Sequence, residues 1–327
     1  MQAAVFTERE PFERGFAEVF RREIVPHLDE LERERRAARA RTLVRLGAVL
    51  AALVAVVALA GLLLEGAIVF LFVLVVLAIV VGGLIVRQPA RAFGSRVRAV
   101  VMPPVCRFFG DMEYRRDAQD TFDLRRFAET GAVGRFNRSH LEDLFVGRYR
   151  DTGFMMAEAV LRRRSGGGRN RSTRTVFRGL LFVIDVPHPF AGRVLLGREH
   201  GWLGNKVADW AESLRGLQRV PFAHEAFESL YQVYADDPAT AQTLLSPPFL
   251  DSLVALAEAH RGRALRAAFT DGVFLLSVPM RRDLFEPASI FRPVYTIEAD
   301  LHRLLLDVTI VHRVIDFLHG DRPEKLA

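Results

Sequence analysis

Two residue types are nearly missing from this chain of 327 residues: cysteine and lysine. The single cysteine, Cys106, excludes a disulfide framework and excludes a metal site built from several thiolates. Only Lys206 and Lys325 are lysines among the 45 basic residues, and this arginine bias favours a bacterial protein from a GC-rich genome. A reducing bacterial compartment is therefore expected.

Charge is missing from two adjacent stretches that are separated only by Glu65. Each stretch has about 20 residues and would span ~30 Å as a helix, which is the thickness of a bilayer's hydrocarbon core. One helix through both would hold Glu65 in mid-membrane at a cost of several kcal/mol. The first stretch begins more than 40 residues into the chain, which argues against a cleaved signal peptide. The sequence therefore predicts a transmembrane hairpin of two helices, about 46–64 and 67–86, that turns at Glu65-Gly66.

The net charge of +6 lies beside the two outer ends of this hairpin. Residues 33–45 contain six Arg and one Glu, and residues 87–110 contain five Arg and no acid. Positive residues on one side predict that both termini are cytoplasmic, here at a bacterial inner membrane. Arginines at this level attract anionic lipid headgroups by ~1 kcal/mol each. We expect lipid contacts, and no nucleic acid, at Arg33, Arg35, Arg36, Arg39, Arg41, Arg45, Arg87, Arg91, Arg96 and Arg98.

Neither predicted span contains a polar or ionisable side chain, so the hairpin is expected to act as an anchor rather than a transport path. Gly47, Ala51 and Ala55 fall four residues apart in the first span. Small residues at this spacing let helices approach closely, which leaves oligomerisation through the spans open.

Apolar residues recur at helical spacing ahead of the spans, at Phe16, Phe20 and Ile24. Pro26 is expected to interrupt this helix, and Glu32 and Arg36 are set to pair in a second one. The arm either lies on the membrane or docks as a stalk, and its acidic balance favours the stalk.

A basic helix is predicted after the spans and is expected to end near Pro103-Pro104. Beyond it, hairpin strands and separated helices predict an α+β fold, with an antiparallel sheet and flanking helices. The predicted parts are a cytosolic helical arm (1–42), the transmembrane hairpin (43–87), a basic juxtamembrane helix (88–110), a cytosolic domain (111–320) and a tail (321–327).

Local signals place the elements of the cytosolic domain. Ser139 and Glu142 form a capping-box pattern, which predicts a short helix ending at Gly147. Asp237 followed by Pro238 predicts another helix start. Strands are predicted over 153–161, 175–186, 194–196, 264–269 and 273–278, and helices over 238–245, 249–262 and 297–320.

The common catalytic motifs are missing. Lys206 lacks the spaced glycines of a phosphate-binding loop, and no dinucleotide fingerprint or nucleophile elbow occurs. His224-Glu225 lacks a second histidine one turn away. We therefore predict no catalytic, cofactor-binding or metal-binding residues.

Four weaker patterns leave alternatives open. An Arg/Gly-rich loop is a candidate site for an acidic partner or phosphate headgroups, or else a solubilising hairpin loop. His302 and His312 with Asp307 and Asp316 provide either a general base or surface ion pairs. Asp236-Asp237 provides either a cation site or a helix cap, and Cys106 either a nucleophile or a buried apolar residue. The candidate arginines of the loop are Arg162, Arg163, Arg164, Arg169, Arg171 and Arg174.

Several short motifs resemble the bacterial membrane-protein family known as domain of unknown function 3137. They are Phe109-Gly110-Asp111, Val176-Phe177-Arg178-Gly179-Leu180, Phe227-Glu228-Ser229-Leu230-Tyr231-Gln232-Val233-Tyr234-Ala235-Asp236-Asp237, Leu244-Leu245-Ser246-Pro247-Pro248-Phe249 and Leu284-Phe285-Glu286-Pro287. The resemblance covers most of 43–318. It implies an integral membrane protein with a cytosolic domain and assigns no catalytic residues.

The leading hypothesis is an interaction or regulatory domain tethered to the inner membrane, with a protein partner still to be identified. One alternative is a membrane-tethered enzyme acting on a lipid or nucleotide. It predicts a pocket that gathers residues 231–237 with His224 or His312. Another alternative is a module that binds anionic lipids.

Overall fold

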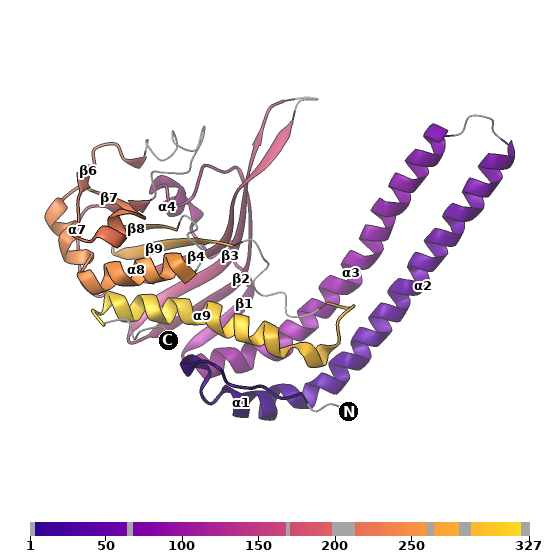
Figure 1. Cartoon of the computed structure of the whole chain (residues 1–327), viewed down its shortest axis with the longest axis horizontal. Helices are drawn as coiled ribbons and strands as arrows, with labels where there is room; N and C mark the ends of the chain where they lie inside the picture. The colour runs from indigo at the N-terminus through magenta and orange to yellow at the C-terminus, as the bar shows by residue number, and fades with distance from the viewer. Residues whose placement is uncertain are drawn as a thin grey trace. The chain divides into compact units, whose positions relative to one another are not determined.

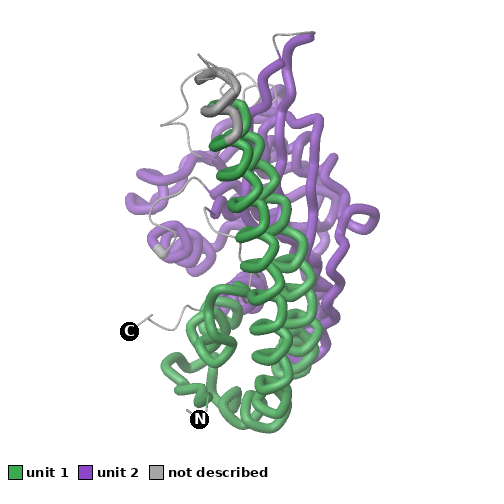
Figure 2. Tube along the Cα trace, turned by 90° about the vertical axis from the view of Figure 1, so that its right-hand side faces the viewer, with its two compact units in different colours: residues 1–108, 286–305 green, residues 109–285, 306–327 purple. Residues whose placement is uncertain are grey.

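The computed structural model describes residues 4–63, 68–167, 171–197, 213–259, 265–280 and 289–321, with side chains described outside 59–71 (Figure 1). The chain forms two compact units, coloured separately in Figure 2. Unit 1 contains residues 1–108 and 286–305, and unit 2 contains residues 109–285 and 306–327. Two long apolar helices and a nine-stranded antiparallel sheet with flanking helices confirm the predicted α+β class.

Unit 1 is built from helices. A short 3₁₀ turn (η1, Pro11–Glu13) leads into α1 (Phe16–Val19), a π-helical turn (η2, Phe20–Ile24) and α2 (Val25–Leu63). The second long helix, α3, spans Ile68–Phe109, and a 3₁₀ turn (η3, Val294–Thr296) comes from the later segment. The predicted turn at Glu65-Gly66 lies outside the described residues.

The expected break at Pro26 is wrong, because the chain stays helical from Phe16 to Leu63. Proline has no backbone N–H and its ring crowds the preceding turn. The π-helical turn lies directly before this position, where Val25 N–H bonds to Phe20 O. A widened turn of this kind accommodates the irregularity without ending the helix.

The expected end of the basic helix at Pro103-Pro104 is also wrong, since α3 continues to Phe109. Val97, Val101 and Val105 are each completely buried and form one stripe across the two prolines. Each interior proline costs about 3 kcal/mol. Burial of this stripe on both sides of the prolines favours continuation of the helix.

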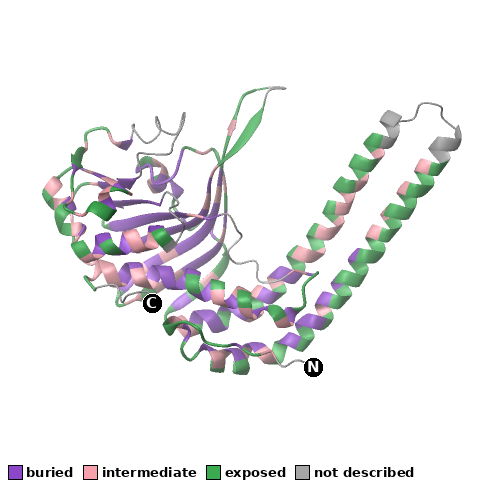
Figure 3. Cartoon of the chain, in the orientation of Figure 1, coloured by how far each residue is buried: buried purple, intermediate pink, exposed green. Residues whose placement is uncertain are grey.

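The apolar stripe of the N-terminal arm is buried inside unit 1 (Figure 3). Phe16 and Ile24 have no exposed surface and Phe20 only 1%. The Phe16 ring meets the edges of Phe6 and Phe108, at centroid distances of 4.9 and 5.1 Å. The arm therefore offers no such apolar face to a membrane, which removes the support for the membrane-lying alternative.

Unit 2 contains one antiparallel sheet in the order β1-β2-β3-β4-β9-β8-β5-β7-β6. Its strands are β1 (Met112–Asp117), β2 (Arg138–Tyr149), β3 (Thr152–Ser165), β4 (Ser172–Asp185), β5 (Val194–Gly197), β6 (Gln218–Val220), β7 (Gln232–Ala235), β8 (Arg266–Thr270) and β9 (Val273–Pro279). The five predicted strands correspond to β3, β4, β5, β8 and β9, which confirms those predictions.

The predicted helix at Ser139 is wrong, because this segment belongs to β2. Ser139 pairs with Leu161 of β3, and its hydroxyl accepts a hydrogen bond from Gln119 instead of capping a helix. A β-bulge follows, with Asp143 at φ 55°. The bulge interrupts the alternation of inward and outward side chains, which hides the strand pattern in the sequence.

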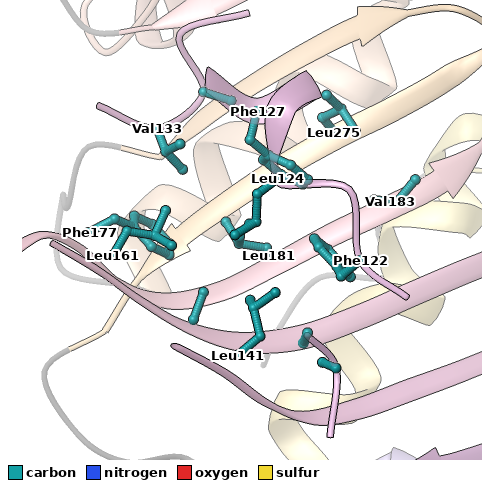
Figure 4. Packing of buried hydrophobic residues seen from close by; sticks show 14 of the residues in the cluster. Phe122, Leu124, Phe127, Val133, Leu141, Leu161, Phe177, Leu181, Val183 and Leu275 are labelled. Carbon is teal, nitrogen blue, oxygen red and sulfur yellow. The ribbon is translucent and has the colours of Figure 1, made fainter. Parts of the chain in front are cut away.

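Helices cover both faces of the sheet. On one face α4 (Leu124–Glu129) inserts Leu124 and Phe127 into a core with Leu181 and Leu275 (Figure 4). On the other, α8 (Pro247–Ala259) places Phe249 5.5 Å from Phe274, between ring centroids. Phe274 and Leu275 are successive residues of β9, so their side chains point to opposite faces.

Helices α7 and α9 follow the predicted signals, whereas α6 was not predicted. Asp237 caps α7 (Pro238–Leu244) by accepting from the amides of Ala239 and Thr240. A short α6 (Glu225–Glu228) precedes it, and α9 (Glu298–Leu318) closes the chain before Gly320. Residues of α9 up to Leu305 belong to unit 1 and later ones to unit 2.

Candidate functional site

The most distinctive surface of unit 1 is the apolar one on α2 and α3. By length and composition both helices are able to cross a membrane, and only 6% and 0% of their most apolar windows are buried. Large side chains such as Leu50, Phe72 and Ile79 are 61%, 69% and 69% exposed. Exposed apolar surface on this scale marks an interaction with a membrane or another apolar partner.

The arginines predicted to contact lipid lie on the charged parts of α2 and α3. Eight of the ten are exposed, and Arg98 is half-buried. Arg36 pairs with Glu32 at 2.9 Å, as the sequence predicts, and Arg96 pairs with Glu34 at 3.0 Å. The exposed residues are Arg33, Arg36, Arg39, Arg41, Arg45, Arg87, Arg91 and Arg96.

Arg35 has a different role, because it is 4% exposed and is held by several hydrogen bonds within unit 1. Its guanidinium donates twice to Glu32, at 2.8 and 2.7 Å, and once to Ile290 O at 2.8 Å. Glu32 also accepts from the Val294 amide at 3.1 Å. Hydrogen bonds from Arg35, Val294 and Arg36 outweigh burial and lower the pKa of Glu32 to about 2. Arg35 is therefore a structural cation that fastens the segment at 290–294 to α2.

The two histidines of α9 make separate contacts, each within its own unit. In unit 1, His302 Nδ1 lies 2.5 Å from Glu13 Oε1, and the two aromatic rings of His302 and Phe6 are 4.5 Å apart. Hydrogen bonds from His302 and from the Arg9 and Glu10 amides outweigh burial and lower the pKa of Glu13. This contact holds the N-terminal segment to α9 and does not position a base over an open site.

His312, in unit 2, stacks on Tyr149 with ring centroids 4.1 Å apart and an interplanar angle of 9°. Burial lowers the pKa of His312 to about 4, so the ring is neutral near pH 7. Asp316, one helical turn further on, pairs with Arg150 at 2.9 Å. Asp307 is buried at 1% exposure.

The residues around the Tyr-Ala-Asp-Asp motif build structure. Tyr231, Val233 and Ala235 are buried, and Asp236 pairs with Arg193 at 3.0 Å. That bond is the main reason why the pKa of Asp236 is lowered. His224 caps α6 and contacts Asp251 at 2.9 Å. Among the described residues, no group of three His, Cys, Asp or Glu side chains is placed to hold a metal ion.

A cavity of about 450 Å³ in unit 2 lies beside Arg193. Arg126, Glu129 and Asp271 also line it, so its wall carries two cations and two carboxylates. The pocket expected from the enzyme alternative would contain His224 or His312, and neither lines this cavity.

The Arg-rich segment is a projecting hairpin rather than a long loop, because β3 extends to Ser165 and β4 begins at Ser172. Arg162, Arg163 and Arg164 therefore lie in β3, and Arg174 lies in β4. Arg171 is exposed beside the turn, and Arg169 lies outside the described residues.

The register of this hairpin sets like charges opposite each other. Arg163 faces Arg174 across β3 and β4, and Arg138 faces Arg162 across β2 and β3. Since successive residues point to opposite faces, each face of this sheet end carries one Arg–Arg pair. Like charges directly opposite are destabilising. Arg138 was not singled out by the sequence, because the pairing depends on the register.

The buried thiol agrees with the apolar interpretation of Cys106, which is 5% exposed within α3.

Gly82 of α3 faces α2, where a Cβ would lie 3.5 Å from the Leu46 side chain. The two long helices therefore approach closely where the uncharged stretches begin and end.

Residues 175–319 match the family model described as "Protein of unknown function (DUF3137)". The match confirms the predicted resemblance to this family over that range, and α2 and α3 precede it. No curated protein sequence matches the chain.

A crystal structure of the mycobacterial trehalose monomycolate transport factor A, TtfA, matches with a TM-score of 0.35 and 10% sequence identity. The match covers 72% of this chain and 98% of that one. A similarity this low supports no argument about fold or function.

Proposed function

We propose that this chain is a bacterial inner-membrane protein whose helices α2 and α3 form the anchor of a cytosolic interaction or regulatory domain. The observation that carries the proposal is the exposed apolar surface of these helices, bordered by arginines at one end only. In water this surface would cost roughly 25 cal/mol per Å². A bilayer removes that cost, and the arginines favour the cytoplasmic side for both termini.

Fractionation tests the anchor. The full chain should sediment with membranes and should dissolve only in detergent. Washing with about 1 M salt or with carbonate at about pH 11 should not extract it, because a spanning helix pair is held by hydrophobic burial and not by charge. A reporter inserted at Gly66 should be accessible from outside the cytoplasm, and one fused after Ala327 should not. Release of the chain by salt or carbonate would contradict the proposal, as would a cytoplasmic reporter at Gly66.

We propose further that the basic end of β2–β4 is where the domain binds an acidic partner. The opposed arginine pairs support this, because the register gathers positive charge on each face of this end of the sheet. Guanidinium groups also form paired hydrogen bonds with carboxylates.

Neutralising one pair tests this second proposal. Arg163→Thr/Arg174→Thr keeps residues suited to strands and should weaken binding of a fluorescent polyglutamate peptide by about tenfold, since hydrogen bonds to charged groups contribute ~1.5 kcal/mol or more. The matched control, Arg115→Thr/Arg148→Thr, removes two exposed strand arginines elsewhere. Fluorescence anisotropy measures both. An equal effect of the two double variants would show that only overall charge matters.

A further inference from the structure

The base of the α2–α3 pair contains a groove of about 460 Å³ that lies entirely within unit 1. Arg41 and Arg45 line it from α2, and Arg96 lines it from α3, together with the carboxylate of Glu34. Phe93, at 4% exposure, supplies an apolar wall. Three guanidinium groups against one carboxylate give the lining a net charge of +2.

Two of the three cations are not neutralised. Arg45 makes no ion pair among the described residues, and Arg41 donates only to the backbone carbonyl of Ala37, at 3.2 Å. Arg96 is already shared by Glu34 at 3.0 Å and Glu30 at 3.7 Å. Arg41 and Arg45 are one helical turn apart and are therefore able to act on one anion. The groove is therefore suited to an occupant with negative charge.

The position of the groove indicates what the occupant carries besides its negative charge. Arg45 is the last charged residue before the uncharged stretch of α2, and Gln88, in the groove, follows Arg87 at the end of the other stretch. Leu84, one turn from Gln88, is 59% exposed. An anion bound here would therefore lie beside the apolar helix surface. A ligand with a phosphate and a hydrocarbon chain matches both the cationic groove and the apolar surface beside it.

We propose that this groove binds the phosphate-bearing headgroup of an anionic phospholipid. Arg41 and Arg45 hold the phosphate, Phe93 packs against the glycerol region, and the acyl chains continue along α2 and α3. Guanidinium groups suit this task because they form bidentate hydrogen bonds with phosphate oxygens. The inference rests on the proposed membrane anchoring, and it adds a defined lipid site to a general attraction between arginines and the membrane surface.

A titration of phosphatidylglycerol into the delipidated full chain in neutral detergent, followed by native mass spectrometry, tests the site. Arg41→Gln/Arg45→Gln should weaken the binding of the first lipid by about 20-fold. The matched control, Arg39→Gln/Arg87→Gln, removes the same amount of charge from the basic parts of α2 and α3 outside the groove, and its affinity should stay within about twofold of the wild type. Arg41→Lys/Arg45→Lys keeps the charge and should recover part of the affinity.

The outcomes separate this inference from the anchoring proposal. Equal weakening in both glutamine variants would overturn the groove site, because diffuse charge would then explain binding. Equal affinity for phosphatidylcholine and phosphatidylglycerol would also overturn it. Displacement of the lipid by millimolar inorganic phosphate would show that the groove takes a free anion instead. If the anchoring proposal is wrong, the wild-type chain will leave the membrane fraction in the fractionation experiment. That result does not depend on the groove variants.

Discussion

Replacing Glu32 by alanine is expected to lower the unfolding free energy of unit 1 by about 3–5 kcal/mol, because it leaves the buried Arg35 guanidinium without its carboxylate. Both side chains are 5% exposed, so water does not take the place of the lost partner. The Val294 amide loses its acceptor as well. One substitution therefore removes the ion pair and the hydrogen bond that hold the segment at 290–294 to α2.

Glu34→Ala is the matched control, since Glu34 lies one half-turn away and pairs with the exposed Arg96. An exposed pair contributes at most about 1 kcal/mol. Thermal unfolding of the full chain in detergent measures both variants, and amide hydrogen exchange at Val294 reports the local change. A Glu32→Ala melting temperature within about 2 °C of that of Glu34→Ala would contradict the role given to the pair.

The same pair should make stability depend on acid. The pKa of Glu32 is lowered from 4.5 to about 2 in the folded chain, so the unfolded chain takes up the proton first. Its contribution is complete above pH 4.5 and is lost as the pH falls towards 2. Glu32→Ala should lack this part of the acid sensitivity.

Gly179→Ala is expected to destabilise unit 2 by about 3 kcal/mol or more, because a Cβ at this position has no room. It would lie 2.0 Å from Val278 O, 2.7 Å from Met280 N and 2.9 Å from Pro279 Cα. Gly179 also has φ 151°, a conformation that residues with a side chain rarely adopt. Because all three obstacles are backbone atoms of β9 or its end, the strand itself must move.

The control for Gly179→Ala is Gly167→Ala, at the exposed hairpin end, where a Cβ meets nothing within 4 Å. This change should alter stability by less than about 0.5 kcal/mol. Limited proteolysis and circular dichroism of unit 2 in the full chain distinguish the two. A fully folded Gly179→Ala chain with the melting temperature of the Gly167→Ala chain would show that β4 and β9 tolerate a wider separation.

Signals that act over a few residues predict their elements well. The Asp271-Gly272 turn joins β8 and β9 with both residues at positive φ, 50° and 76°, which is the geometry of a two-residue type I′ hairpin. Asp237 caps α7 as its sequence context predicts. The uncharged stretches correspond to two helices with exposed apolar surfaces. In each case the residues that determine the conformation are neighbours in the chain.

Features that depend on distant partners are missed. The sequence predicts the pair between Glu32 and Arg36, but the buried bond to Arg35 gains its environment from Val294, 262 residues away from Glu32. For that reason the sequence alone groups Arg35 with the arginines that are expected to contact lipid. The opposed arginine pairs at the hairpin end require the register of three strands, and the groove at Arg41 and Arg45 requires α3 beside α2.

The edges of the sheet, as the described strands define them, bear on whether copies of the chain pair with one another. One edge is β1, which exposes Glu113, Arg115 and Arg116, and the other is β6, with only three residues. Charged side chains on one edge and a very short strand on the other both discourage the edge-to-edge pairing that open sheets invite. Under the anchoring proposed above, domains confined to two dimensions would meet each other often, and these edges would let neighbours collide without polymerising into a continuous sheet.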